Sequence, residues 1–181
     1  MTVNWFSMSE PKLAHINLLL LDVDGVLTDG RIYYDARGEE IKTFNSKDGL
    51  GLHLLMTAGI QVGIITARQS NALRHRCEDL GIDLLFENIK DKASVLDQVT
   101  IRSGIGMQET AFVGDDLLDL PLFGKVRVAI AVADAHPVVR EKADMVTTAN
   151  GGAGAVREVC DAILKEKGLW NEIVARYAST V

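Results

Sequence analysis

The chain has few cysteines and few prolines, and it has no long apolar run. Its two cysteines, Cys77 and Cys160, each fall in a helical pattern, which excludes a disulfide scaffold and predicts reduced core thiols. With 3 prolines and 16 glycines among 181 residues, it is neither collagen-like nor rich in linkers. No apolar stretch approaches the ~18 residues that a membrane span requires.

Cations are also in deficit. The 19 Lys and Arg residues against 25 Asp and Glu residues give a net charge of −6, which disfavours nucleic acid as a partner because that binding depends on clustered cations. The first residues lack the basic and long apolar parts of a signal peptide, so we expect a cytoplasmic protein. The remaining composition, 48% hydrophobic and 24% charged, is that of a globular protein, and the length predicts one domain over residues 1–181.

Apolar runs alternate with segments of helical spacing along most of the chain. We expect strands at residues 17–23, 60–66, 82–86, 110–114, 126–132 and 143–147. We expect helices at residues 50–58, 69–80, 91–103, 117–123, 137–142 and 153–167. Strands that are apolar throughout, such as Leu18-Leu-Leu-Leu21, are typical of parallel sheets covered on both faces. The sequence therefore predicts an α/β fold with a doubly wound, Rossmann-like parallel sheet.

One segment interrupts this alternation directly after the first strand. Residues 31–44 contain two short β-like runs on either side of Asp35-Ala-Arg-Gly38, which predicts a β-hairpin with glycine in its turn. The interval from Asp24 to Thr66 holds this hairpin, a helix and a strand. It leaves no room for a cap domain, so we expect the hairpin to form a flap beside the sheet edge where α/β proteins bind ligands.

Acidic side chains follow the first expected strand. Asp22 and Asp24 stand in Asp22-Val-Asp-Gly, a pattern that a polar turn explains as well as a catalytic site does. Later strands end in similar signals: Thr66 ends the second, Lys92 follows the third, and the fourth runs into a group of carboxylates at Asp115, Asp116 and Asp119. The carboxyl ends of parallel strands open on one side of a sheet, so these groups can converge.

The chemistry of this set is that of phosphoryl transfer. Carboxylate oxygens are ligands for Mg²⁺, and a lysine with a hydroxyl can bind phosphoryl oxygens. A carboxylate beside the ion can attack phosphorus and form an aspartyl-phosphate. Each signal is weak alone, whereas their order along the chain predicts a magnesium-dependent phosphatase.

The same residues resemble the four motifs of the haloacid dehalogenase superfamily of phosphatases. Asp22-Val-Asp-Gly-Val-Leu-Thr28 is similar to the first motif, Thr66 to the second, Lys92 to the third and Gly114-Asp-Asp-Leu-Leu-Asp119 to the fourth. The resemblance implies that Asp22 is the nucleophile. It further implies that Asp24 is the general acid and base and that Thr66 and Lys92 bind the phosphate. Mg²⁺ would be held by Asp22, Asp115 and the backbone carbonyl of Asp24. Asp116 and Asp119 would support these ligands.

A closer resemblance covers residues 18–167. Blocks at 22–30, 38–40, 44–45, 48–49, 129–137 and 151–160 are similar to a branch of the superfamily that dephosphorylates an eight-carbon sugar acid during lipopolysaccharide precursor synthesis. That resemblance implies a homo-oligomer, most simply a homotetramer, and substrate contacts from Asp24, Asn45, Ser46, Lys47, Asp48, Gly49, His53, Arg68, Arg76 and Lys92. Ala67, Ala153 and His53 depart from the residues common in that branch, so a nine-carbon sugar acid, a nonulosonate 9-phosphate, is the alternative substrate.

Several of these assignments have a plain alternative. Arg68 is either a surface arginine or a bidentate partner for a substrate carboxylate. Arg76 and His53 are equally consistent with solvated helix faces, and the tail at residues 169–181, with Trp170 and Tyr177, is a possible wall of the site. A receiver-type signalling domain, phosphorylated on aspartate, also combines acids, threonine, lysine and Mg²⁺. In receivers, however, the phosphorylated aspartate ends a middle strand, whereas Asp22 ends the first.

Overall fold

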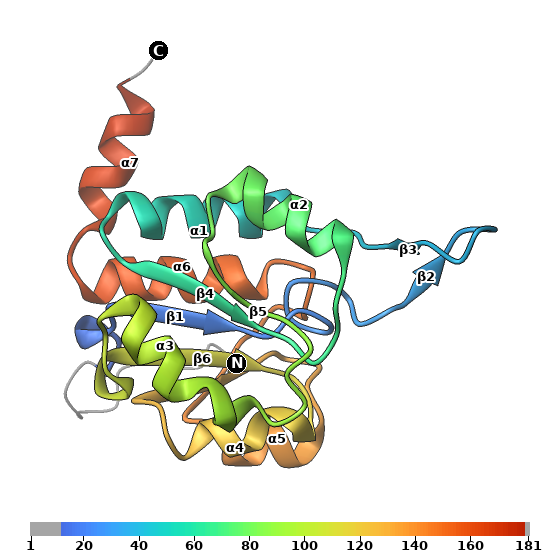
Figure 1. Cartoon of the computed structure of the whole chain (residues 1–181). Helices are drawn as coiled ribbons and strands as arrows, with labels where there is room; N and C mark the ends of the chain where they lie inside the picture. Colours follow the sequence, from blue (N-terminus) through green and yellow to red (C-terminus); the bar gives the residue numbers. More distant parts are fainter. Residues whose placement is uncertain (1–11, 180–181) are drawn as a thin grey trace.

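The computed structural model describes residues 12–179, and a six-stranded parallel sheet forms its centre (Figure 1). The strands lie in the order β5-β4-β1-β6-β7-β8. Their bounds are β1 Leu18–Leu21, β4 Gln61–Ile65, β5 Leu84–Phe86, β6 Thr110–Gly114, β7 Val128–Ala131 and β8 Met145–Val146. Leu18 pairs with Gln61 on one side and with Thr110 on the other. The predicted doubly wound sheet is confirmed.

Helices cover both faces of the sheet. One layer contains α1 (Ser46–Thr57), α2 (Asn71–Leu80) and α6 (Ala155–Glu166), as Figure 1 shows. The other layer contains α3 (Leu96–Ser103), α4 (Leu120–Phe123) and α5 (Pro137–Lys142). Short 3₁₀ turns complete the chain: η1 Lys12–His15, η2 Lys92–Val95, η3 Met107–Glu109 and η4 Leu117–Asp119. Within residues 12–179, no helix combines the length and apolarity of a membrane span.

The core forms around β1, whose four leucines are fully buried. Burying each of these side chains contributes roughly 1.5–3 kcal/mol relative to exposure, so this strand anchors the sheet. Its neighbours β4 and β6 are nearly as apolar, and Gly63 of β4 lets the side chains of Leu20 and Leu84 approach closely. The loops that follow these buried strands therefore emerge from a rigid base.

Several expected helices differ from the observed ones, most clearly at α1 and at residues 91–103. Helix α1 begins at Ser46 rather than at residue 50, because the Asn45 side chain caps it by accepting the Lys47 N–H and because Asp48 is buried against α6. Residues 45–49, which lie before the helix expected at 50–58, thus form its cap and first turn. The helix expected at 91–103 is split into η2, capped by Asp91, and α3.

The hairpin predicted after the first strand is confirmed. Strands β2 (Tyr33–Tyr34) and β3 (Glu40–Ile41) pair antiparallel, with Tyr33 opposite Ile41. The Asp35 carboxylate accepts the backbone N–H groups of Arg37 and Glu39, which closes the turn. Figure 1 shows the hairpin projecting away from the sheet and helices.

The C-terminal tail forms a further helix, α7 (Trp170–Ala178), which rises from the end of α6 (Figure 1). The cationic groups of Arg157 and Lys165 lie over the Trp170 ring, 5.9 and 5.1 Å from its centroid, and hold the base of α7 to α6. Tyr177 is exposed on α7. The last two positions of the expected tail, residues 180–181, lie outside the described residues.

Candidate active site

The predicted catalytic groups come together at the carboxyl ends of the strands. Asp22 follows β1, Thr66 follows β4, Asp115 follows β6 and Lys92 begins η2. All four line one hollow of about 290 Å³. Asp22 and Asp115 lie on either side of the point where the strand order reverses, between β1 and β6, which is where open α/β sheets bind ligands.

Lys92 is the central cation of this hollow. Its side chain is 2% exposed, and its Nζ lies 2.8 Å from Asp22 Oδ1 and 2.5 Å from Asp119 Oδ1. Burial acts to lower the pKa of Lys92, but the two carboxylates outweigh it and raise that pKa. Lys92 is therefore a fixed positive charge beside Asp22.

Asp119 is a structural partner for the loop after β6. Its second oxygen, Oδ2, accepts the backbone N–H groups of Asp115 at 2.8 Å and Asp116 at 3.2 Å. The Asp116 side chain in turn caps η4 by accepting the Leu117 N–H. With both oxygens engaged and 1% exposure, Asp119 fixes Lys92 and the backbone that carries Asp115.

Negative charge exceeds positive charge in this hollow. Oxygens of Asp22, Asp115 and Asp119 lie within 4.8 Å of one another. Burial, followed by repulsion from Asp22 and Asp119, raises the pKa of Asp115 to about 8. Burial likewise raises the pKa of Asp22 to about 6, although Lys92 opposes the rise. A further cation would remove this penalty.

The donor set suits a hard divalent cation. Asp115 Oδ1 is buried and has no hydrogen-bond partner among the described residues. Asp22 and Asp115 offer carboxylate oxygens, the ligands that Mg²⁺ prefers. Gly25 has a φ of +91°, and a Cβ there would lie 2.1 Å from Asp115 Oδ2, so only glycine lets the loop after β1 pass beside this carboxylate. The residues present therefore fit a magnesium ion.

The hairpin supplies two groups to the site that the sequence did not indicate. Lys42, directly after β3 and with a side chain only 3% exposed, donates a hydrogen bond to Asp24 Oδ1. Glu40 accepts a hydrogen bond of 2.7 Å from Arg68 Nη2, and the Tyr34 hydroxyl accepts another of 3.2 Å. Arg68 is thus held by the hairpin and is not a free surface arginine.

Comparison with known proteins agrees with this geometry. A family model described as haloacid dehalogenase-like hydrolase matches residues 85–159. The 3-deoxy-D-manno-octulosonate 8-phosphate phosphatase KdsC of Escherichia coli (strain K12) is 45% identical over 161 residues, which are 89% of this chain and 86% of that protein. The chain belongs to the haloacid dehalogenase-like hydrolases.

Solved structures of this family have the same fold. The phosphatase of Moraxella catarrhalis, in complex with a magnesium ion, a phosphate ion and a KDO molecule, is 39% identical and has a TM-score of 0.90, covering 94% of this chain and 99% of its own. The cobalt-bound phosphatase of Haemophilus influenzae is 44% identical with a TM-score of 0.85, covering 88% and 93%. Both likenesses cover most of this chain.

The topology also excludes the receiver alternative. With the hairpin set aside, the third sheet strand along the chain, β5, lies outside the second, β4, and the order is 3-2-1-4-5-6. Receiver domains have the flavodoxin-like order 2-1-3-4-5. The hydrolase assignment and the strand order thus agree.

A second hollow adjoins the catalytic one. It measures about 730 Å³ and lies between the hairpin and the start of α2, with Tyr34, Glu40, Ser70 and His75 among its lining residues. Arg68 lines both hollows. A molecule that extends out of the catalytic hollow in this direction must pass its guanidinium group.

The other residues expected to contact substrate do not line the catalytic hollow. Asn45 caps α1 and donates from Nδ2 to the Gly152 carbonyl at 3.3 Å, and Asp48 accepts the Arg157 N–H at 2.8 Å. Arg76 lies over the Phe44 ring, 5.8 Å from its centroid, and His53 is exposed on α1. Ser46 and Lys47 are also exposed, and Gly49 is buried beside Arg76.

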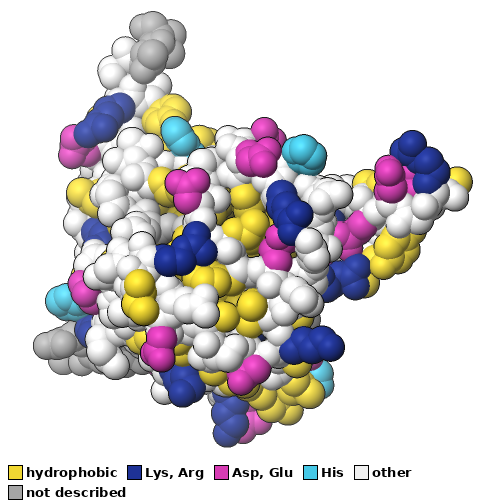
Figure 2. All heavy atoms as spheres, in the orientation of Figure 1, with side chains coloured by type: hydrophobic (Ala, Val, Ile, Leu, Met, Phe, Trp, Pro, Cys, Tyr) yellow, Lys and Arg dark blue, Asp and Glu magenta, His cyan; other side chains and the backbone are white. Residues whose placement is uncertain are grey.

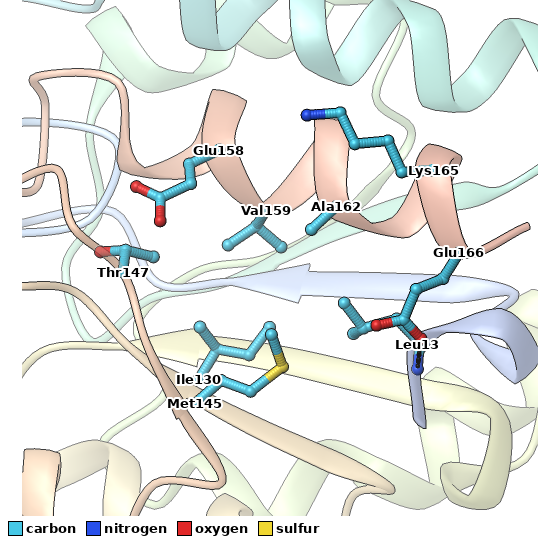
Figure 3. Close-up of a pocket in the computed structure, with 9 residues that line it drawn as sticks. All are labelled: Leu13, Ile130, Met145, Thr147, Glu158, Val159, Ala162, Lys165 and Glu166. Carbon is cyan, nitrogen blue, oxygen red and sulfur yellow. Dashed lines mark hydrogen bonds between the residues drawn. The ribbon is translucent and has the colours of Figure 1, made fainter. Parts of the chain in front are cut away.

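A third hollow, of about 300 Å³, is unrelated to the catalytic chemistry. Figure 3 shows Val159 and Ala162 of α6 pointing toward Ile130 and Met145 of the sheet, with Glu158, Lys165 and Glu166 around the apolar centre. Glu166 accepts the Leu13 N–H at 2.9 Å. This hollow offers apolar contact and lacks the strand-end loops that carry Asp22 and Asp115.

Proposed function

We propose that the protein hydrolyses 3-deoxy-D-manno-octulosonate 8-phosphate to the free sugar acid and phosphate, in the synthesis of lipopolysaccharide precursors. The observation that carries this proposal is the buried Asp22–Lys92–Asp119 arrangement with Asp115 beside it, opening past Arg68 into a larger polar hollow. The 45% identity to an enzyme of that name supports the substrate.

Asp22 is proposed as the nucleophile. One of its carboxylate oxygens attacks phosphorus while the bond from phosphorus to the sugar oxygen breaks, giving an aspartyl-phosphate. Asp24 gives a proton to the leaving sugar oxygen and then takes one from the water that attacks the aspartyl-phosphate. Lys92 and Thr66 hold phosphoryl oxygens, and Lys92 also offsets the charge of Asp22 as the two anions approach.

Magnesium is the proposed cofactor. Asp22, Asp115 and the backbone carbonyl of Asp24 would hold it, while Asp116 and Asp119 keep the loop after β6 in place. When bound, it supplies positive charge to the phosphoryl oxygens. This explains how a chain with a net charge of −6 can bind an anionic substrate, since the local charge decides.

The substrate is proposed to span the two adjoining hollows, which share Arg68. The phosphate end belongs among Asp22, Thr66 and Lys92, and the sugar acid extends into the hairpin hollow. Arg68, between the two, is proposed to bind the substrate carboxylate through its bidentate guanidinium group. The remaining expected contacts, from Asn45, Ser46, Lys47, Asp48, Gly49, His53 and Arg76, are proposed to reach the site of a neighbouring subunit.

A homotetramer is the proposed assembly. The hairpin exposes Ile32, Tyr33, Tyr34 and Ile41 by 42–60%, and Figure 2 shows apolar side chains gathered on it. Leu118, at the rim of the catalytic hollow, is 55% exposed. A two-stranded hairpin is marginal by itself in water, so pairing with a neighbour would stabilise it and cover the site.

The chain is further proposed to be one cytoplasmic domain over residues 1–181. Both layers of helices pack on the same six-stranded sheet, which supports a single domain. Cys77 and Cys160 are free and buried, which is typical of proteins from a reducing compartment.

A steady-state panel of phosphorylated sugar acids tests the proposed substrate. We expect the highest kcat/KM for 3-deoxy-D-manno-octulosonate 8-phosphate, well above that for nonulosonate 9-phosphates and for sugar phosphates without a carboxylate. If a nonulosonate 9-phosphate is preferred, the proposed roles of the catalytic residues stand, but the proposed substrate is wrong. Equal rates on all phosphates would contradict selection by Arg68.

A further inference from the structure

The contacts of Arg68 point to a role for Glu40 that goes beyond the catalytic groups. Arg68 Nη2 already donates to Glu40 Oε1 at 2.7 Å and to the Tyr34 hydroxyl at 3.2 Å, and Arg68 Nε lies 3.6 Å from Asp24 Oδ2. This Nε is buried and has no hydrogen-bond partner among the described residues. The guanidinium group is therefore partly occupied, with one unused donor at the catalytic hollow.

A substrate carboxylate arriving from that hollow meets Glu40. Bidentate binding through Nε and the adjacent Nη2 requires the donor that Glu40 holds. Glu40 already places a negative charge on Arg68, so a second carboxylate on the same group would be repelled. The substrate and Glu40 therefore compete for Nη2.

Glu40 has a second cation within reach. Lys42 Nζ lies 3.4 Å from Glu40 Oε1, and the other oxygen of Glu40, Oε2, is buried without a partner among the described residues. Burial acts to raise the pKa of Glu40, but the nearby Ser70 and Arg68 outweigh it and lower that pKa, so the group is a carboxylate at neutral pH. Glu40 can thus leave Arg68 and remain paired with Lys42.

We propose that Glu40 is a specificity-determining residue. In the free protein its carboxylate pairs with Arg68, where the substrate carboxylate would bind. When a sugar acid binds, Glu40 releases Arg68 and pairs with Lys42 alone. This rests on the proposed function, because it takes Arg68 as the carboxylate-binding group. Glu40 then sets the affinity for carboxylated substrates without affecting phosphates that lack a carboxylate.

The experiment compares Glu40→Gln with Glu78→Gln. Both remove one negative charge, but Glu78 is an exposed residue of α2 that lines neither hollow. We expect Glu40→Gln to lower KM for 3-deoxy-D-manno-octulosonate 8-phosphate by about two- to fivefold, since a partly exposed pair is weak. The kcat for that substrate, the kinetics with p-nitrophenyl phosphate and both activities of Glu78→Gln should stay near wild type.

Two further measurements separate the outcomes. In an Arg68→Ala background, Glu40→Gln should no longer change KM, because the competition needs the guanidinium group. A raised KM for the sugar acid would make Glu40 a positioning residue for Arg68 and overturn the exchange, as would equal changes for both substrates or no change. Absence of sugar-acid hydrolysis by the wild type would overturn the proposed function and this inference together, whereas hydrolysis with KM unaffected overturns only the inference.

Discussion

The catalytic hollow and the hairpin are built in opposite ways. Around the hollow, Lys92 and Asp119 are almost fully buried and follow or support strands of the central sheet. The hairpin consists of two strands of two residues each and exposes the apolar side chains of Tyr33 and Ile41. A rigid base thus carries the groups proposed for phosphoryl transfer, while a marginal element carries those proposed to face the rest of the substrate.

This division has a physical reason. Reacting groups must be held within a fraction of an ångström, which buried strands and paired charges provide. Selection of a substrate needs contacts that adapt, and surface elements with few buried contacts provide them. We therefore expect changes in the hollow to affect all phosphate substrates, and changes at the hairpin to affect only those with a sugar-acid body.

The largest effect is expected from Asp22→Asn. The amide keeps the shape of the side chain but is no longer the attacking carboxylate, so phosphate release should fall by about 10³-fold or more for every substrate. Steady-state phosphate release measures this, with circular dichroism to show that the fold is retained. Asp97→Asn, an exposed change on α3, is the control. Activity within tenfold of wild type would refute Asp22 as the nucleophile.

The second largest loss of activity is expected from removal of divalent cations. Treatment with a chelator is expected to reduce hydrolysis to about 1% or less, and Mg²⁺ should restore it, because Asp22 and Asp115 offer only oxygen ligands. The loss should be equal for p-nitrophenyl phosphate and for a phosphorylated sugar acid. Full activity in chelator would show that Lys92 and Thr66 suffice without an ion.

Arg68→Ala should separate the two regions. Loss of a charge-assisted contact to a carboxylate typically costs ~1.5–3 kcal/mol, so kcat/KM for 3-deoxy-D-manno-octulosonate 8-phosphate should fall by about ten- to a hundredfold. For p-nitrophenyl phosphate it should change little. Arg37→Ala, at the exposed hairpin turn, is the matched control. An equal fall for both substrates would assign Arg68 to the phosphate or the fold, and no fall would show that it does not contact the substrate carboxylate.

The central sheet and the catalytic hollow could be predicted from the sequence because their signals are local. The leucine run of β1 and the side chains directly after each strand place Asp22, Thr66 and Asp115 without knowledge of distant contacts. The start of α1 could not be predicted in this way. Gly49 and Gly51 weaken its helical propensity, and tertiary contact between Asp48 and α6 compensates.

The hairpin side of the site escaped prediction for a related reason. Glu40 and Lys42 reach Arg68 and Asp24 only because the returning arm of the hairpin passes beside the loops after β1 and β4, across separations of 28 and 18 residues. No periodicity or short motif indicates such a contact. An ion pair between a two-residue strand and a distant turn is set by the tertiary fold.

The smallest effect is expected from weakening the hairpin's apolar surface. Tyr33 and Ile41 are cross-strand neighbours, 42% and 50% exposed, and each would be buried if hairpins pair between subunits. The double change Tyr33→Ser with Ile41→Ser should shift the oligomer toward monomers in light scattering. It should lower kcat/KM a few-fold for the sugar-acid phosphate and leave p-nitrophenyl phosphate nearly unaffected. Ile101→Ser, at an apolar side chain of α3 that is 81% exposed, removes similar surface elsewhere and should change neither property. An unchanged oligomer would show that other surfaces hold the subunits together, and a monomeric wild type with full activity would show that one protomer's hairpin is sufficient for selection.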